Sequence, residues 1–342
     1  MFDLNHYVPI LKTKAGEMWA LMHMESKWRA QMTPLFEVHK HKVKKDTKPK
    51  PLDLHVGGVC ESILKCWGTS DPFFLDTEWI NRDYGMNEAL TVALNACRNL
   101  GLKAIPVIKI GYDDTALSAV KSAVAMDGRG CMLRLDFEDA GARTAVGAMF
   151  NRLGMELTDA HLMLDYREHT MKLIEDVHRL PALGEWKTFT ASSAAFPKTI
   201  STMPPKTWID VPRHDWNAWE QSTAHGDLPR NAIFSDYATR CAGPPANGGD
   251  PIVHLRYTKD RKWLVYRDGT VHSGDAPRMK LICRKLIARR DYDRPDFSEG
   301  DREISIIAHQ DEKMGNPRQW VQWCVSHHLT FVTQQLQSLA AI

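Results

Sequence analysis

The sequence lacks the long apolar run that would carry a chain across a membrane. No stretch approaches the roughly 18 consecutive apolar residues that a membrane-spanning helix needs. The opening residues, MFDLNHYVPILKTK, also lack the basic start and long apolar stretch of a secretory signal. Seven cysteines are present, an odd number, and no two are spaced as C-x-x-C. We therefore expect a cytoplasmic protein with buried, reduced thiols and no structural zinc site.

Several catalytic signatures are missing as well. The chain contains no phosphate-binding P-loop, no G-x-S-x-G nucleophile elbow and no H-E-x-x-H zinc motif. The first predicted strand is followed by KTKAGE rather than by a G-x-G-x-x-G dinucleotide loop. The formal net charge of +2 is too small to define a partner, so only local charge clusters are informative.

One repeated unit dominates what the sequence does contain. A short apolar run rich in β-formers ends in a polar residue, and a loop and a helical pattern follow. Because the runs are apolar at nearly every position, we expect parallel strands covered on both faces. The eight runs span residues 7–12, 32–38, 72–79, 103–110, 131–137, 161–166, 186–192 and 232–238. This repetition predicts a TIM-like (β/α)₈ barrel, with a doubly wound open sheet as the alternative.

The spacing also divides the chain into two regions. Helical patterns cover residues 16–29, 87–100, 114–126, 139–153 and 167–179, and longer loops are expected at 40–53 and 194–217. After the turn-forming residues 244–249, two short strands (252–258 and 262–269) predict a hairpin, followed by a basic helix over 277–290 and a long amphipathic tail helix. We expect a barrel over 1–245 and a C-terminal extension over 246–342, packed on the barrel and able to supply its eighth helix.

Charged residues recur where the predicted strands end. In a parallel barrel the carboxyl ends of all strands meet on one face, so these side chains are expected to share one mouth. The carboxylates there, including Asp136, would hold Mg²⁺ or Mn²⁺ or act as general acid and base, although no cofactor is required. The lysine and arginine side chains would bind phosphate or carboxylate. The competing interpretation is that the charges only neutralise one another. The candidate catalytic residues are Lys12, Glu37, Asp76, Lys109, Arg134, Asp165 and Asp236, and Thr190 ends the remaining strand.

Other polar residues are candidates for binding. The lysine-rich loop after the second strand would attract nucleic acid, nucleotides or an acidic protein, unless it is simply a solvated loop. Serines after the seventh strand lie where barrels often bind phosphate, and a polar turn is the plainer interpretation. Two adjacent tail histidines point in different directions on a helix, which makes them poor metal ligands. These candidates are Lys42, Lys44, Lys45, Ser192, Ser193, Arg256, His327 and His328.

Motifs at both ends of the chain point to a family. The opening YVPILKTKAGEMWAL, followed by MTPLFEV, and the tail with Ser298-Glu-Gly-Asp301 and His327-His328-Leu-Thr330 resemble the phage "beta protein" family. This resemblance implies an accessory protein of phages, satellite phages or prophages. The founding member is similar to an antidote against a toxin encoded beside it, and related pairs are regarded as candidates for anti-phage defence.

Three hypotheses follow from these observations. The first is an antidote or defence protein whose barrel mouth binds an anionic ligand or the protein encoded by the neighbouring gene. The second is a metal-dependent hydrolase that acts on a phosphorylated or nucleic-acid substrate. The third is a barrel that assembles with itself as a homo-oligomer, through the tail residues Trp320, Trp323, Phe331 and Leu336.

Overall fold

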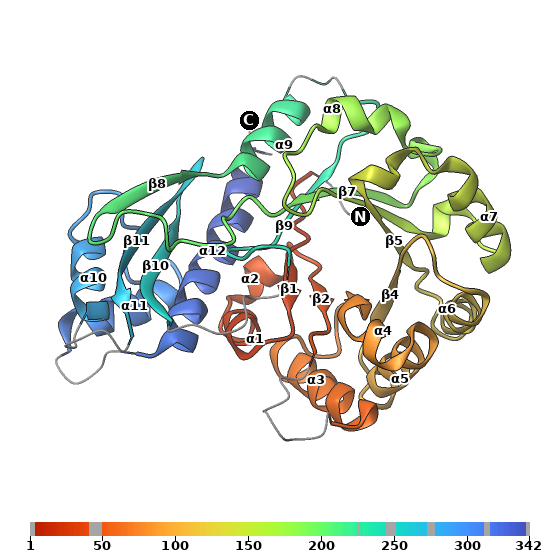
Figure 1. Cartoon of the computed structure of the whole chain (residues 1–342), viewed down its shortest axis with the longest axis horizontal. Helices are drawn as coiled ribbons and strands as arrows, with labels where there is room; N and C mark the ends of the chain where they lie inside the picture. The colour runs from red at the N-terminus through yellow and green to blue at the C-terminus, as the bar shows by residue number, and fades with distance from the viewer. Residues whose placement is uncertain are drawn as a thin grey trace.

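Eight parallel strands form the central sheet, in the order β1-β2-β3-β4-β5-β6-β7-β9 (Figure 1). The computed structural model describes residues 4–40, 50–224, 226, 228–243, 251–271, 278–310 and 315–339. The strands are β1 (Ile10–Lys12), β2 (Leu35–Glu37), β3 (Phe73–Asp76), β4 (Ala104–Ile108), β5 (Met132–Asp136), β6 (His161–Asp165), β7 (Thr188–Ser193) and β9 (Ile233–Asp236).

The ends of this sheet meet beside the first strand. Tyr7 forms a parallel bridge with Phe234, and the Val8 N–H donates to the Phe234 carbonyl at 3.1 Å. All eight predicted strands are present, so the (β/α)₈ barrel is confirmed.

Helices surround the strands, mostly where the apolar periodicity places them. The predicted helix over 114–126 begins after Asp113, whose carboxylate accepts the Ala116 N–H at 2.8 Å, and the helix ending at 153 is closed by the left-handed Gly154. The helices of this layer are α1 (Ala15–Met22), α2 (Ser26–Arg29), α3 (Leu52–Cys66), α4 (Glu78–Tyr84), α5 (Met86–Asn99), α6 (Asp114–Asp127), α7 (Arg143–Leu153), α8 (Leu173–Asp176) and α9 (His214–Ala224). Helices α3, α4 and α9 were not predicted, and the single pattern over 16–29 breaks into two helices.

Alternate residues of each strand point into the barrel or out toward the helices, as the period of two requires. The lower part of the barrel interior is apolar and buried. The strand residues that point outward, such as Leu133 and Leu162, belong to the larger core beneath the helices. The interior apolar residues include Val8, Ile10, Leu35, Phe74, Ile105, Val107, Met132, Met163 and Ile233.

A second, antiparallel sheet lies beside the barrel, in the order β10-β11-β8. Its strands are β8 (Trp208–Pro212), β10 (Ile252–Thr258) and β11 (Lys262–Thr270). The hairpin predicted after residue 250 is therefore present. The expectation of a loop throughout 194–217 was wrong, because β8 pairs with β11 and α9 begins at His214. The predicted boundary at 245 lies outside the described residues.

Three helices complete this extension: α10 (Arg278–Ile287), α11 (Glu299–His309) and α12 (Pro317–Leu339). Helix α12 packs against α1 on one side and β10 on the other (Figure 1). Its Val325 and Leu329 belong to the barrel core, whereas Trp320 and Trp323 belong to the core of the extension. The expected oligomer contact cannot use Trp320, Trp323 and Leu336, because these side chains are buried within the chain itself.

Two expectations from composition can be compared with the structure. All seven cysteines are free, and only Cys241 is not fully buried. Within the described ranges, no helix combines the length and apolarity that a membrane crossing would need.

Candidate functional site

Strand register brings the predicted mouth residues to one level. Lys12 pairs with Glu37, and Glu37 pairs with Asp76, on three neighbouring strands. On the other side of the barrel Asp136 pairs with Asp165. Because paired residues of neighbouring strands face the same side of a sheet, these side chains line the upper barrel interior above the apolar layer.

The Arg134 guanidinium lies at the centre of this layer and is 1 % exposed. Its Nη1 donates to Asp76 Oδ2 at 2.6 Å and its Nη2 to Glu37 Oε1 at 3.0 Å. Its Nε and Nη2 both donate to Asp165 Oδ2, at 2.9 and 2.7 Å. Tyr237, whose hydroxyl donates to Asp165 Oδ2 at 2.6 Å, completes the cluster. One buried cation thus holds three carboxylates from three strands, which makes a rigid floor rather than an open catalytic group.

A second tier of charges lies next to this floor. Arg167 donates from Nε to Asp136 Oδ1 and from Nη2 to Glu78 Oε2, each at 2.8 Å. The Lys109 ammonium lies 2.8 Å from the same Glu78 oxygen and 3.8 Å from Asp136. Arg167, Glu78 and Asp136 are partly exposed, so solvent and a ligand can reach them, whereas the Lys109 ammonium is buried.

Glu78 and Arg167 were not predicted as site residues. Each follows a strand-ending aspartate by two positions, and its backbone N–H donates to that aspartate: Glu78 to Asp76 at 2.8 Å and Arg167 to Asp165 at 2.9 Å. Arg167 adopts φ +52°, a left-handed conformation that is unusual for a non-glycine residue and is held here by surrounding contacts. A charged residue two positions after a strand-ending aspartate, as in Asp-x-Glu or Asp-x-Arg, could therefore have identified both as site residues.

The pKa values of Glu37 and Asp76 shift in opposite directions in this environment. Burial opposes ionisation of Glu37, but Arg134, His39, Arg167 and Lys12 outweigh burial and lower its pKa to about 2. Burial dominates at Asp76 and raises its pKa despite the contact with Arg134. A carboxylate that stays charged and one that more readily takes a proton thus lie side by side.

A cavity of about 310 Å³ opens above the second tier, at the carboxyl ends of β3, β5 and β6. Three rings, Trp79, Phe137 and His169, contribute to its wall, and Phe137 and His169 lie 4.8 Å apart between centroids. Its charged lining consists of Glu78, Asp136, Glu138, Arg167 and Glu168. We call this the mouth cavity. A second cavity of about 340 Å³ shares Glu168 and His169 with it and extends toward Phe196 and Lys198.

Other predicted residues lie near the mouth without lining the mouth cavity. The Lys12 ammonium donates to the Cys241 carbonyl at 2.9 Å and the Gly243 carbonyl at 2.5 Å, and burial lowers its pKa. Ser192 faces the barrel interior beside Asp165, its register partner, whereas the Ser193 hydroxyl donates to the His169 carbonyl at 3.0 Å. Lys42, Lys44 and Lys45 lie outside the described residues.

Asp236 does not belong to the mouth, contrary to the prediction. Its carboxylate accepts the Tyr7 hydroxyl at 2.5 Å, His328 Nε2–H at 2.9 Å and the Ala238 N–H at 2.9 Å, and all of these groups are buried. The side chain faces outward because Ile233 and Ser235, not Asp236, occupy the inward positions of β9. Asp236 therefore joins the barrel to α12.

The remaining candidates, His327 and Arg256, hold parts of the fold together and do not line the mouth cavity. His327 is fully buried, with Nδ1 2.9 Å from Asp301 Oδ2 and Nε2 2.8 Å from the Thr258 carbonyl. The adjacent histidines thus face different carboxylates, as their positions on a helix require. Arg256 donates to the Thr239 carbonyl and stacks over Phe196 at 4.1 Å, with burial lowering its pKa to about 9.

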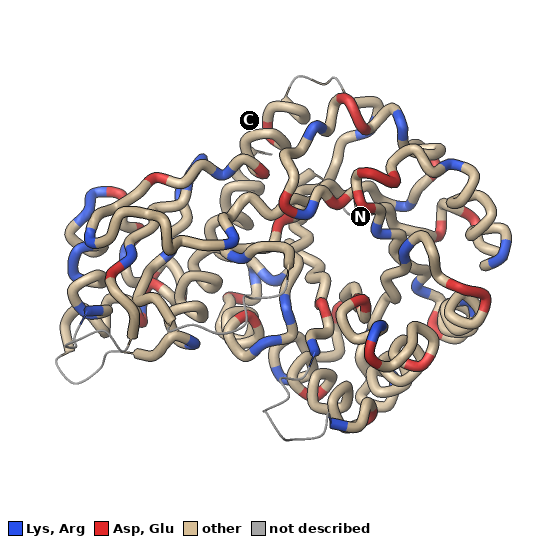
Figure 2. Tube along the Cα trace, in the orientation of Figure 1, with Lys and Arg blue, Asp and Glu red and all other residues tan. Residues whose placement is uncertain are grey.

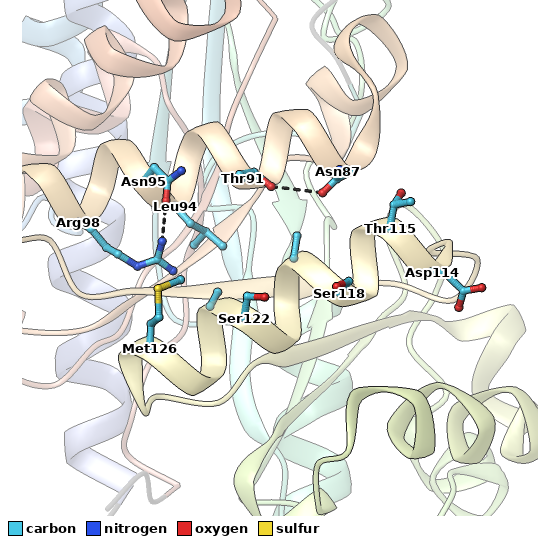
Figure 3. Close-up of a pocket in the computed structure, with 12 residues that line it drawn as sticks. Asn87, Thr91, Leu94, Asn95, Arg98, Asp114, Thr115, Ser118, Ser122 and Met126 are labelled. Atoms are coloured by element: carbon cyan, nitrogen blue, oxygen red, sulfur yellow. Dashed lines mark hydrogen bonds between the residues drawn. The ribbon is translucent and has the colours of Figure 1, made fainter.

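A larger groove lies elsewhere, between α5 and α6 on the outer helical layer (Figure 3). It measures about 570 Å³ and is lined mainly by small polar side chains such as Thr91, Ser118 and Ser122. Arg98 points along it and donates to Asn95 at 2.7 Å. The residues that line this groove form no charge network like that of the mouth, so the mouth cavity is the better candidate site despite its smaller volume.

The described residues contain no group of three or more His, Cys, Asp or Glu side chains placed to hold a metal ion. In the mouth, the Arg134 guanidinium occupies the position between Glu37, Asp76 and Asp165 where a cation would be bound. Mg²⁺ or Mn²⁺ binding remains a prediction from sequence.

Comparison with known proteins places the chain in a family. No curated protein matches it. A GH138 enzyme targeting pectin rhamnogalacturonan II is a similar solved structure, with 10 % identity and a TM-score of 0.39. The similarity covers 82 % of this chain but only 41 % of that enzyme, so this chain spans less than half of its length. The sequence model of the Beta protein family matches residues 7–334, nearly the whole chain, and this protein therefore belongs to the Beta protein family.

Proposed function

We propose that this Beta protein is a phage- or prophage-encoded antidote or defence protein that binds its partner through the mouth cavity. The observation that carries the proposal is the cavity itself. It lies at the carboxyl ends of the strands, the face on which barrels place their functional residues, and it stands on a rigid charged floor. The antidote or defence context is supported by membership of the family.

The lining favours a positively charged or hydrogen-bond-donating group of the partner. Four carboxylates and one arginine line the cavity; two of the carboxylates pair with Arg167 and a third, Glu168, with Lys198, which leaves Glu138 available. The rings of Trp79 and Phe137 add aromatic surface, which attracts a cation. Glu138 is exposed and forms no ion pair with any residue that the structure describes. An anionic ligand would instead depend on Arg167 and Lys109, which already pair with Glu78 and Asp136. A basic side chain of a partner protein therefore fits better than an anion.

The test is a pull-down of the tagged chain with the protein encoded by the neighbouring gene. Glu138→Lys reverses the charge of an exposed cavity residue, and like charges at an interface cost several kcal/mol, so we expect a loss of binding of at least about tenfold. Glu61→Lys, on the outer surface of α3, makes the same change away from the mouth and should bind normally. No complex with the unaltered chain, or equal binding by both variants, would contradict the proposal.

The metal-dependent hydrolase remains the alternative prediction. Calorimetry with MgCl₂ and MnCl₂ distinguishes it from the proposal, because a hydrolase of this kind must bind the ion. Binding heat that Glu37→Gln abolishes would favour the hydrolase and place the ion at the floor.

A further inference from the structure

Helix α10 presents a basic face at the end of the molecule that lies away from the barrel. Residues 278–290 contain six lysines and arginines and no acidic residue. Figure 2 shows blue segments gathered along α10 at this end of the molecule. Toward the protein interior, α10 buries Met279, Ile282, Cys283 and Leu286 against β10, β11 and α11. The opposite side therefore faces solvent.

Three exposed cations form what we call the α10 basic face: Arg284 and Lys285 on α10, and Arg290 three residues beyond its end. Arg284 donates from Nε to the Ala308 carbonyl at 2.8 Å, which leaves both terminal nitrogens without a partner among the described residues. The Lys285 ammonium donates one hydrogen bond, to the Tyr266 hydroxyl at 2.7 Å. Arg290 has no ion pair within the described part of the chain. Among the described residues, no acidic side chain pairs with these three cations, although Asp291 pairs with the neighbouring Arg289.

The aromatic rings beside this face hold cations in place. Lys285 lies 4.9 Å from the Tyr266 ring centroid, and the neighbouring Arg289 lies 5.4 Å from that of Trp208. Trp208 and Tyr266 contact each other edge to face, as register partners of β8 and β11. A cation that is already fixed by a ring loses less conformational entropy when it meets an anion, which favours binding.

We infer that the α10 basic face binds the phosphate backbone of duplex DNA without reading its sequence. Arg284 and Lys285 are adjacent on a packed helix and Arg290 follows its end, and such clustered cations complement the row of phosphates along a duplex. Proteins that bind single strands stack bases on exposed rings, but Tyr266 is buried here and Trp208 is covered by Arg289. The exposed Leu281, at 50 %, lies within the same face and would contact sugar rather than base. This surface is separate from the mouth cavity and does not depend on the function proposed for it.

The experiment measures fluorescence anisotropy of a labelled duplex DNA over a range of salt concentrations. The triple variant Arg284→Gln, Lys285→Gln, Arg290→Gln removes three phosphate contacts. We expect it to lose about tenfold or more in affinity at about 50 mM salt, and the slope of log K against log salt to fall by about 2 to 3. The control variant Lys27→Gln, Arg152→Gln, Lys172→Gln removes the same charge from exposed barrel positions and should bind like the unaltered chain.

Three outcomes would overturn the inference. The unaltered chain could fail to bind duplex DNA at the lowest salt concentration, or both triple variants could be weakened equally, which would indicate diffuse charge rather than a site. Tighter binding of a single-stranded oligonucleotide than of the duplex would also overturn it. Thermal unfolding of both triple variants verifies that they are folded, as expected for exposed side chains.

Discussion

Arg134 holds Asp165 through two nitrogens, with Nε and Nη2 both donating to Asp165 Oδ2 at 2.9 and 2.7 Å. This pair links β5 to β6 inside the barrel, and the same guanidinium reaches Glu37 on β2 and Asp76 on β3. Arg134 thus links strands β2, β3, β5 and β6 across the barrel interior. Its removal should be costly because the carboxylates would remain buried without their cation.

Replacing Arg134 with methionine should lower the free energy of unfolding by about 3 to 5 kcal/mol near neutral pH, the range for a broken buried ion pair. The deficit should shrink as the pH falls, because protonation relieves the orphaned carboxylates. Urea unfolding at several pH values measures both effects. Arg302→Met, which breaks an exposed pair with Glu299, should cost less than about 1 kcal/mol. An Arg134→Met variant as stable as the unaltered chain would show that these ion pairs do not contribute to the free energy of unfolding.

Glu37 should make the folded chain sensitive to acid. Its pKa is lowered to about 2 in the folded state, so the unfolded chain takes up this proton first as the pH falls. The stabilisation is fully present above the ordinary pKa of a glutamate and is lost as the pH falls through the folded value. Glu37→Gln should therefore show a shallower fall of the free energy of unfolding between about pH 5 and about pH 3.

The exposed Glu138→Gln variant is the comparison for this pH profile, because Glu138 has no ion pair within the described residues. It should follow the unaltered chain. If Glu37→Gln also follows the unaltered chain, the ionised form of Glu37 is not stabilised by folding.

Asp236→Asn should weaken the joint between β9 and α12 and leave the mouth unaffected. The carboxylate accepts three buried hydrogen bonds, so we expect a loss of stability of about 1 to 3 kcal/mol. Binding of the partner, measured by pull-down well below the unfolding temperature, should be retained. Loss of partner binding with unchanged stability would place Asp236 in the site after all.

Gly300 should tolerate no side chain. A Cβ there would overlap the Trp323 carbonyl, where α11 approaches α12, and the Gly300 N–H donates to the Ser326 hydroxyl at 3.1 Å. Gly300→Ala should therefore destabilise the chain by several kcal/mol, about as much as overpacking a tight core. Gly58→Ala, on an exposed part of α3 with open space around the new methyl, should instead stabilise it by about 0.5 to 1 kcal/mol. Similar thermal midpoints for the two variants would contradict the close approach.

The sequence was sufficient to predict the barrel, because eight apolar runs separated by helical patterns leave few arrangements that bury them all. It also identified Glu37, Asp76, Arg134 and Asp165, whose positions at strand ends follow from topology. It failed at Asp236 for a specific reason. Asp165 and Asp236 both end a strand and precede a tyrosine, but β9 is shifted by one residue relative to β6, so Ser235 takes the inward place and Asp236 faces outward.

Strand β8 and the partner residues Glu78 and Arg167 were missed for other reasons. The β8 sequence, WIDVP, is short and follows a stretch rich in proline, serine and threonine, and only pairing with β11, some fifty residues later, makes it a strand. Glu78 and Arg167 lie two residues beyond Asp76 and Asp165, the last residues of β3 and β6, so the pattern of polar strand ends does not include them.

Hydrogen exchange on the complex with the protein of the neighbouring gene tests the central claim most directly. If the mouth cavity is the binding site, backbone amides of residues 136–138 and 166–169 should gain protection when the partner is added, while those of α5 and α6 should not change. Protection of the α5–α6 groove or another surface, with the mouth unchanged, would contradict the claim.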